Sequence, residues 1–297
     1  MSDPEFVETT EPDEAFAALS DETRVAILQA LWDAEEHEAT FSELREAVGV
    51  RDSGQFNYHL GKLTDEFVRG TDDGYELTAA GAQVVGAVEG GSFTMVGSIE
   101  PTTLDEPCPA CGGERTLRYE DDLLAIECEN CDMSAQGTVP PGALADADTD
   151  SVSELATRYF RNVIRTVDGG FCLYCDGPIE ATVTTVDERA PPDATVPERF
   201  RDLPFVEYVC GRCGEEVGSD LGLALLSHPA VGGFYYDHGV DVREDSLWKF
   251  VAWNTDSAWV ERREPFRAVV TYGADGDTLR LVVDDELTVH EVERSDR

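Results

Sequence analysis

Apolar side chains recur every three or four positions between residues 13 and 90, which is the spacing of helices that bury one face. The first clear stripe consists of Val25, Ile27, Leu28 and Leu31. Ser20 is a candidate cap for this helix, because a serine side chain accepts from the free N–H groups of a first turn. Asp21 and Glu22 suit the positive end of the helix dipole. The pattern therefore predicts a run of short helices at the start of the chain.

The next two helices are delimited by polar residues. FSELREAVGV begins after a capping box of Thr40 and Glu43, and Gly49 ends it. SGQFNYHLGKL has a similar start in Asp52 and Gln55. Its predicted buried stripe consists of Phe56, Leu60, Leu63 and Phe67. The side chains left facing outward are Ser53, Gln55, Asn57, Tyr58, Gly61 and Lys62.

A hairpin and a further helix complete this region. FVRGTDDGYELT is typical of two short strands around a DDG turn, and Thr78 is placed to cap the helix AAGAQVVGAVEGG. Helix, helix, turn, helix, hairpin, helix is the order of a winged helix-turn-helix. The helix after the turn then needs one apolar face for the core and one face of amide and hydroxyl groups for base edges and phosphates.

The rest of the chain predicts helices and antiparallel strands. SVSELATRYFRNVIRTVDGG is expected to be a helix capped by Ser151 or Ser153. Its apolar face consists of Leu155, Tyr159, Phe160, Val163 and Ile164. Residues 219–253 predict three short helices, broken near Pro229 and at Gly239. Residues 258–293 alternate between apolar and polar positions around a DGD turn, which predicts a small antiparallel sheet.

All eight cysteines fall into four CxxC pairs. They are Cys108 and Cys111, Cys128 and Cys131, Cys172 and Cys175, and Cys210 and Cys213. Sixteen residues separate the first two pairs, which is a zinc-ribbon spacing, and 34 separate the last two. The longer insert reads as a strand, a proline-rich excursion and another strand. Four thiolates close a tetrahedron around Zn²⁺ and leave no open position for substrate, so we expect two structural zinc ions.

Three other uses of these cysteines fit the sequence less well than zinc binding does. Disulfides need an oxidising compartment, which nothing in the sequence indicates. Thioredoxin-like chemistry expects one CxxC at a strand-to-helix junction rather than four in matched pairs. Iron–sulfur clusters use similar ligands, but the two-knuckle pattern favours zinc. The expected fold is α+β: an N-terminal winged helix-turn-helix, two zinc-ribbon-like β modules, and short C-terminal helices with a small antiparallel sheet.

Four segments follow from these patterns. Residues 1–12 are expected to be a flexible acidic tail, residues 13–92 the DNA-binding domain, and residues 93–150 the first zinc ribbon with its linkers. Residues 151–297 are expected to hold a helix, the second zinc ribbon and an α+β C-terminal domain. With 297 residues and 41% hydrophobic residues, the chain can bury more than one core.

Charge is the unusual feature of the composition. There are 62 acidic against 22 basic residues, spread along the whole chain, which gives a formal net charge of −40. The composition resembles proteins of salt-accumulating haloarchaea, where a Debye length of about 3 Å near 1 M salt would screen repulsion from DNA. Residues 51–64 have a local balance of +1. Because no apolar run approaches the roughly 18 residues of a membrane span and no signal peptide is evident, we expect a cytoplasmic protein without membrane contact.

LSDETRVAILQAL, FSELREAVGV and SGQFNYHLGKL together resemble the ArsR-type winged helix-turn-helix of archaeal transcription regulators, over about the first third of the chain. The resemblance implies a dimer on double-stranded DNA. It places on the DNA-facing side Ser53, Gln55, Asn57, Tyr58 and Lys62, with Arg69 of the hairpin near the neighbouring backbone. The metal-sensing branch of that family carries cysteines on the helix that here reads FSELREAVGV. This helix has none, so sensing through it is not supported.

One further group is a candidate ligand pocket in the C-terminal half. It consists of His228, Tyr235, Tyr236, Asp237, His238 and Trp248. The alternative, which we favour, is aromatic packing and helix ends, with His238 at a helix C-terminus. Likewise His59, beside the buried stripe of its helix, is expected to pack or cap rather than to contact phosphate.

The leading hypothesis is a sequence-specific DNA-binding transcription regulator. We expect a homodimer formed by the first and last helices of the N-terminal domain, with an unknown effector or partner at the zinc-bearing half. The alternative is a protein- or RNA-binding adaptor in which the ribbons make the contact. Its candidate residues are Arg115, Arg118, Tyr119, Tyr174 and Arg212. No hydrolase, metalloprotease or nucleotide-binding motif is present, so we expect no enzymatic activity.

Overall fold

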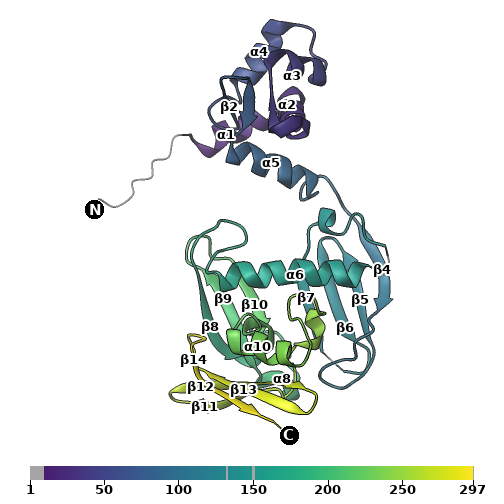
Figure 1. Ribbon diagram of the computed structural model, residues 1–297, viewed down its shortest axis with the longest axis vertical. Coiled ribbons are helices and arrows are strands. Elements are labelled where there is room, and N and C mark those ends of the chain that lie inside the picture. Colours follow the sequence, from purple (N-terminus) through teal and green to yellow (C-terminus); the bar gives the residue numbers. More distant parts are fainter. Residues whose placement is uncertain (1–9, 132, 149–150, 297) are drawn as a thin grey trace, which may run out of the picture. The chain divides into compact units, whose positions relative to one another are not determined.

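A computed structural model of the chain describes residues 10–131, 133–148 and 151–296. The chain divides into two compact units, residues 1–95 and 96–297 (Figure 1). It is a mixed α+β protein with several small antiparallel sheets, as the sequence predicted. Most of the expected N-terminal tail lies outside the described residues, and the first helix begins at Pro12.

Unit 1 contains the helices and the hairpin that the sequence predicted. Its elements are α1 (Pro12–Leu19), α2 (Glu22–Asp33), η1 (Glu35–His37), β1 (Glu38–Ala39), α3 (Phe41–Val48), α4 (Ser53–Gly61), β2 (Val68–Gly70), β3 (Tyr75–Leu77) and α5 (Ala79–Glu89). The hairpin gains a third, unpredicted strand, since β1 pairs with β3 and gives the sheet order β1-β3-β2. The core includes Ile27, Leu28, Leu31, Leu44, Phe56, Leu60, Leu63, Phe67 and Val85.

Capping residues fix where these helices begin. Thr40 and Glu43 form the expected capping box, and Gly49 ends α3 in the left-handed region with a φ of 75°. Asp52 caps α4 by accepting from the N–H of Gln55 at 2.7 Å. The prediction that Ser20 caps α2 is wrong. Asp21 accepts from the first-turn N–H groups of α2, while the Ser20 hydroxyl donates to a carbonyl of the preceding helix.

Helix α4 is shorter than predicted, although its apolar stripe is buried as expected. The helix ends at Gly61, and Leu63 and Phe67 reach the core from the segment that follows. The hydroxyl and the N–H of Thr64 both donate to the Leu60 carbonyl, at 2.9 and 3.1 Å. Asp65 then adopts a φ of 80°, which an α-helix does not accommodate. This local turn stops the helix.

The first sheet of unit 2 has the order β4-β5-β6-β7. Its strands are β4 (Ser98–Thr103), β5 (Arg115–Glu120), β6 (Leu123–Cys128) and β7 (Ser134–Thr138), followed by η2 (Pro141–Ala143). The segment expected to be a linker therefore supplies a strand. Its sequence alternates weakly, and β4 forms because it pairs with the edge of β5.

The second sheet has the order β10-β9-β8 and contains the predicted excursion. Its strands are β8 (Ile179–Thr185), β9 (Pro204–Cys210) and β10 (Glu216–Asp220), and the excursion between the first two carries α7 (Val186–Arg189) and α8 (Glu198–Arg201). The expected strand, proline-rich stretch and second strand are all present. A third sheet, β11-β12-β13-β14, is the predicted C-terminal one.

Helix α6 (Val152–Asp168) spans the first two sheets of unit 2 and packs into the cores of both (Figure 1). Its predicted apolar face is only half-buried. The fully buried side chains of α6 are Val152, Ala156, Thr157, Arg161 and Val167. Arg161 is buried because its guanidinium donates to the carbonyls of Val242 and Asp245 from a distant loop. Periodicity could not reveal that partner.

The remaining elements follow the prediction closely. They are α9 (Leu221–Ala224), α10 (Pro229–Asp237), η3 (Leu247–Lys249), β11 (Ala258–Arg263), β12 (Phe266–Ala274), β13 (Asp277–Val283) and β14 (Val289–Ser295). The helices break at His228, which caps α10, and at Gly239 with a φ of 73°. In the described part of the chain, no helix combines the length and the apolar character that crossing a bilayer requires.

Candidate metal centres and nucleic-acid interface

The first four-cysteine cluster lies at one end of the first sheet. Cys108 and Cys111 belong to a turn before β5, while Cys128 ends β6 and Cys131 follows it. The turn closes through the N–H of Cys108, which donates to the Gly113 carbonyl at 2.8 Å, and Gly112 has a φ of 72°. The sulfur of Cys108 lies 3.7 Å from that of Cys131, and the Cys111 and Cys128 sulfurs are 3.5 Å apart.

The second cluster repeats this geometry at the end of the second sheet. The N–H of Cys172 donates to the Gly177 carbonyl at 2.9 Å, and the N–H of Cys210 donates to the Glu215 carbonyl at 2.9 Å. The sulfurs of Cys172 and Cys213 are 3.7 Å apart, and those of Cys175 and Cys210 are 3.5 Å apart. The structure therefore brings the CxxC motifs together in the two pairs that the sequence predicted.

Both clusters fit a tetrahedral metal ion. Within each cluster the four sulfurs lie within 4.8 Å of one another, and none of the eight cysteines forms a disulfide. Bonds of about 2.3 Å from four sulfurs to a central ion require sulfur–sulfur edges of about 3.8 Å. Two edges in each cluster, at 3.5 and 3.7 Å, are close to this value and the others do not exceed 4.8 Å, so each cluster can hold a thiophilic ion with all four positions filled.

Backbone N–H groups favour the thiolate form at one cysteine of each cluster, whereas burial and the neighbouring thiols raise the pKa of Cys131 and Cys213 to about 12. The N–H groups of Cys213 and Arg212 donate to the sulfur of Cys210 and lower the pKa of that thiol to about 6. At Cys128 burial raises the pKa, but the N–H of Asn130 and the neighbouring thiols outweigh it, so the pKa falls to about 7. A low thiol pKa helps metal binding, because the ligand is the thiolate.

Helix α4 presents the second candidate site, on unit 1. Ser53, Gln55, Asn57, Tyr58 and Lys62 are all exposed, as the sequence predicted, whereas Phe56 and Leu60 are buried on the opposite side. Tyr58 is 61% exposed, and the Lys62 ammonium lies 5.9 Å from its ring centroid. Helix α4 contains no acidic residue, although 62 of the 297 residues of the chain are acidic.

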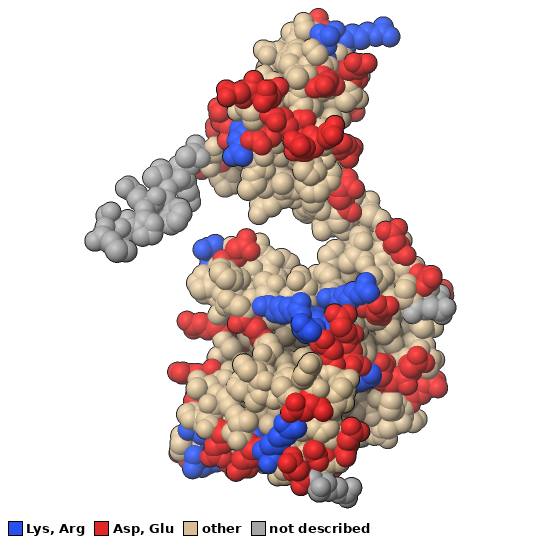
Figure 2. Space-filling model, viewed as in Figure 1, with Lys and Arg blue, Asp and Glu red and all other residues tan. Residues whose placement is uncertain are grey.

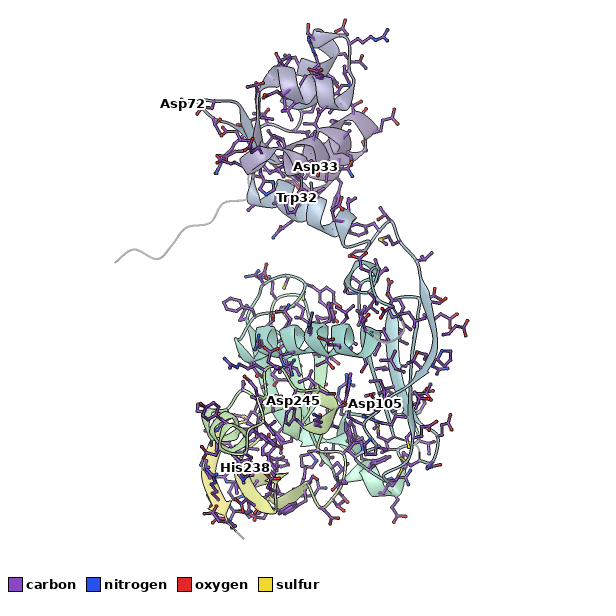
Figure 3. The ribbon with its side chains drawn as sticks, turned by 45° about the vertical axis from the view of Figure 1, so that its right-hand side comes forward. Trp32, Asp33, Asp72, Asp105, His238 and Asp245 are labelled. Carbon is purple, nitrogen blue, oxygen red and sulfur yellow. The ribbon has the colours of Figure 1, made fainter. Side chains whose placement is uncertain are left out.

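The charges around α4 are uneven. In Figure 2 a basic group projects from the α3–α4 end of unit 1 beside a few acidic ones, whereas acidic side chains predominate over the rest of that unit. Among the described residues, Arg51 and Lys62 form no ion pair, while Arg69 pairs with Glu76 at 2.5 Å. Asp72 at the tip of the hairpin points into solvent (Figure 3). The α4 surface is therefore more open to an anion than the hairpin is.

His59 packs α4 against α2. The sequence predicted that this residue packs or caps, but it did not reveal the partner. His59 is buried, and its Nδ1 lies 3.3 Å from the Asp21 carboxylate that caps α2. Burial raises the pKa of Asp21, but the charge of His59 and the N–H groups of Arg24 and Thr23 lower it further, so the net pKa is lowered. The contact with Asp21 was missed because the two residues lie 38 positions apart.

The candidate pocket of the C-terminal half does not converge on one site. His228 accepts the N–H of Ala230 and borders one hollow, and Asp237 pairs with Arg294 on a separate one. His238 ends α10 and bonds to Asp277 beside the C-terminal sheet (Figure 3). The structure also buries Tyr235 and Trp248 in different cores, whereas Tyr236 is exposed. Packing and capping account for these positions, including the expected role of His238.

Residues 105–289 match the model of a family described as "Domain of unknown function (DUF7351)". The chain belongs to this family. Residues 12–88 match a second model, described as "Domain of unknown function (DUF7347)". The DUF7351 match takes in both cysteine clusters, and the DUF7347 match runs from α1 almost to the end of α5. Searches among curated proteins and among solved structures found no match to the chain.

Proposed function

We propose that this chain is a sequence-specific DNA-binding transcription regulator, in which unit 1 is a winged helix-turn-helix of the ArsR type. The observation that carries the proposal is the surface of α4. One side anchors the helix with Phe56 and Leu60. The other side presents exposed hydroxyl, amide and cationic side chains, and between Ser53 and Lys62 there is no acid, in a chain of net charge −40.

The chemistry of this row suits a major groove. Gln55 and Asn57 can each form two hydrogen bonds with one adenine, which gives sequence discrimination. Ser53, Tyr58 and Lys62 can donate to phosphates and so fix the position of the helix. Arg69 would have to exchange Glu76 for a phosphate, so we assign the hairpin a minor part in binding.

The proposed regulator is a homodimer. Apart from Tyr58 of α4, the exposed large apolar side chains of unit 1 lie on helices α1 and α2 and in the turn after α5, namely Phe16, Trp32, Phe93 and Met95. Exposed apolar groups of this size favour burial against a partner. A second copy on these helices would present two α4 helices to successive major grooves, about 34–36 Å apart.

We assign one structural Zn²⁺ to each cysteine cluster, held by Cys108, Cys111, Cys128 and Cys131, and by Cys172, Cys175, Cys210 and Cys213. When bound, zinc would cross-link the two turns of each ribbon. Four thiolates leave no position for a reacting molecule, which agrees with a protein that is not an enzyme. Metal analysis should find two zinc ions per chain; one ion, or iron, would contradict the assignment.

A second candidate function is the protein- or RNA-binding adaptor. The first ribbon offers it little, because Arg115 and Tyr119 are buried and Arg118 pairs with Glu127. Tyr174 and Arg212 of the second ribbon are exposed and favour it. In this alternative the protein or RNA partner contacts the cysteine-bearing end of the second ribbon, and the winged helix serves as a scaffold. The contact would form in a cytoplasm of high salt.

Selection of binding sites from a random duplex library, in molar KCl, tests the proposal. The wild-type chain should enrich one motif, and Asn57→Ala/Tyr58→Ala should enrich none while keeping its circular dichroism. Gln136→Ala/Tyr236→Ala is the matched control, since it removes an exposed amide and an exposed tyrosine from unit 2. Loss of enrichment in the control, or its retention in the α4 variant, would remove α4 from the interface.

A further inference from the structure

The two cysteine clusters occupy equivalent positions in two ribbons. In each ribbon a strand begins four residues after the second cysteine, at Arg115 or at Ile179. That first residue pairs directly with the third cysteine, as Arg115 with Cys128 and Ile179 with Cys210. The two clusters thus provide an internal comparison, in which an arginine beside one set of sulfurs is replaced by an isoleucine beside the other.

Arg115 is a buried cation whose charge is balanced by the Glu106 carboxylate and by two sulfurs of the first cluster. Its side chain is 1% exposed, and Nε and Nη2 donate to the backbone carbonyl of Glu106 at 3.0 and 2.9 Å. The nearest carboxylate oxygen, on Glu106, is 4.0 Å away. Burial lowers the pKa of Arg115, while Glu106, Cys108 and Cys128 act in the opposite direction. A buried guanidinium is costly unless it faces negative charge, and here thiolates complete that balance.

Ile179 contributes no charge at the second cluster. It is buried in the core that includes Cys172 and Cys210. Four thiolates around a divalent ion carry two excess negative charges. The guanidinium beside the second cluster is that of Arg212, which donates to the Cys175 carbonyl at 2.7 Å but is exposed, so solvent screens its charge far more than that of the buried Arg115. Groups just outside the ligands typically change metal retention by about 10- to 100-fold.

The packing of side chains around the two clusters also differs. Cys108 and Cys128 pack with Phe200 and Leu203, and Asn254 donates to the carbonyl of Pro109 at 3.0 Å, so the rest of unit 2 covers the first cluster. At the second cluster the turn is open, with Phe171 56% and Tyr174 65% exposed. The cysteines themselves are equally covered, since each cluster has two buried, one half-buried and one exposed, so the difference lies in the residues around the ligands.

We infer that Arg115 is a positioning residue that compensates the charge of the first metal site, and that the two sites hold their ions unequally. The first site retains its ion, while the second exchanges its ion with the surroundings. The inference rests on the proposed zinc occupancy of both clusters. It makes the second cluster the point at which metal supply or thiol oxidation acts on the protein.

Stepwise metal release from the full chain tests this inference. Zinc displaced by 4-(hydroxymercuri)benzoate in molar KCl is followed with the dye 4-(2-pyridylazo)resorcinol. Alkylation and mass spectrometry of the cysteines identify the site that has opened. We expect one ion in a fast phase, with Cys172, Cys175, Cys210 and Cys213 exposed, and one in a phase at least about tenfold slower. Arg115→Ile should speed only the slow phase, by about tenfold or more.

The second site is the internal control, because its fast phase should be the same in Arg115→Ile. Arg115→Lys keeps the charge, loses the forked donation to Glu106, and should give an intermediate rate; it also serves if the isoleucine variant does not fold. A single phase in wild type, first opening of the Cys108 cluster, or an unchanged slow phase in Arg115→Ile contradicts the inference. A chain that binds no zinc contradicts the zinc assignment as well, whereas two ions lost together contradict the inference alone.

Discussion

Single buried polar residues tie the elements of this protein together. His59 joins α4 to the capping carboxylate of α2, and Arg161 joins α6 to a loop some 80 residues away. Among the buried polar side chains of the described residues, Asp220 is the acidic one. One of its oxygens accepts from the N–H groups of Gly222 and Ala252 at 2.9 and 2.8 Å, and so connects α9 to the loop before β11.

Asp220 should make stability depend on pH. Burial raises its pKa to about 6, although the N–H groups of Ala252, Leu223 and Gly222 lower it. The folded state therefore binds this proton more tightly than the unfolded state, whose pKa is about 3.9. The resulting stabilisation is complete below about pH 4 and is lost as the pH rises through about 6.

Asp220→Asn keeps an oxygen acceptor and cannot ionise. The free energy of unfolding of Asp220→Asn minus that of wild type should be about 3 kcal/mol larger at pH 7 than at about pH 4, because folding raises the pKa of Asp220 from about 3.9 to about 6. Urea denaturation in molar KCl measures it, with the exposed Asp193→Asn as control. Parallel pH curves for wild type and Asp220→Asn would contradict the burial argument.

Elements were predictable where their signals are local. The capping box of α3, the Asp52 cap of α4, the DDG hairpin and the CxxC turns all depend on residues fewer than six positions apart, and all were found. Strands β1 and β4 exist through pairing with distant segments, so the local pattern did not reveal them. Likewise, Arg115 looked like a surface residue because its burial depends on the Glu106 carbonyl and on Cys128 of the neighbouring strand, which only the fold brings near.

The capping box offers a test of the α3–α4 arrangement. Thr40→Ala removes the acceptor of the Glu43 N–H and the hydroxyl that donates to the Glu43 carboxylate, while the backbone N–H of residue 40 still donates to it; the change should cost about 1 kcal/mol of unit 1 stability. Hydrogen exchange should then be faster in α3. Ser42→Ala, an exposed residue of the same helix, should leave exchange unchanged. Equal exchange in both variants would mean that packing alone fixes the start of α3.

At the scale of the whole molecule, charge sets the conditions in which the protein works. Acidic side chains are spread over both units in the view of Figure 2, and the formal net charge is −40. Most arginines of unit 2 are committed to acids; Arg280, for example, pairs with Glu261 and Glu293. Because self-repulsion of this size opposes folding in dilute buffer, high salt should favour the compact state.

Thermal unfolding should therefore shift with salt. The midpoint should rise steadily as KCl increases from about 0.1 M to several molar, since screening shortens the range of repulsion from about 10 Å to about 3 Å. Circular dichroism in KCl measures it, and sucrose at equal osmolarity is the control for non-ionic effects. A midpoint that does not respond to KCl would mean that the acidic surface is neutral for stability.

The central claim is that α4 reads DNA. Genome-wide crosslinking of the tagged chain in the cells that express it tests this most directly, with the Asn57→Ala/Tyr58→Ala variant alongside. We expect discrete peaks that share one motif, disappear in the variant and persist in Gln136→Ala/Tyr236→Ala. No peaks, or the same peaks in the α4 variant, would contradict the claim and leave the exposed end of the second ribbon as the surface that makes contact.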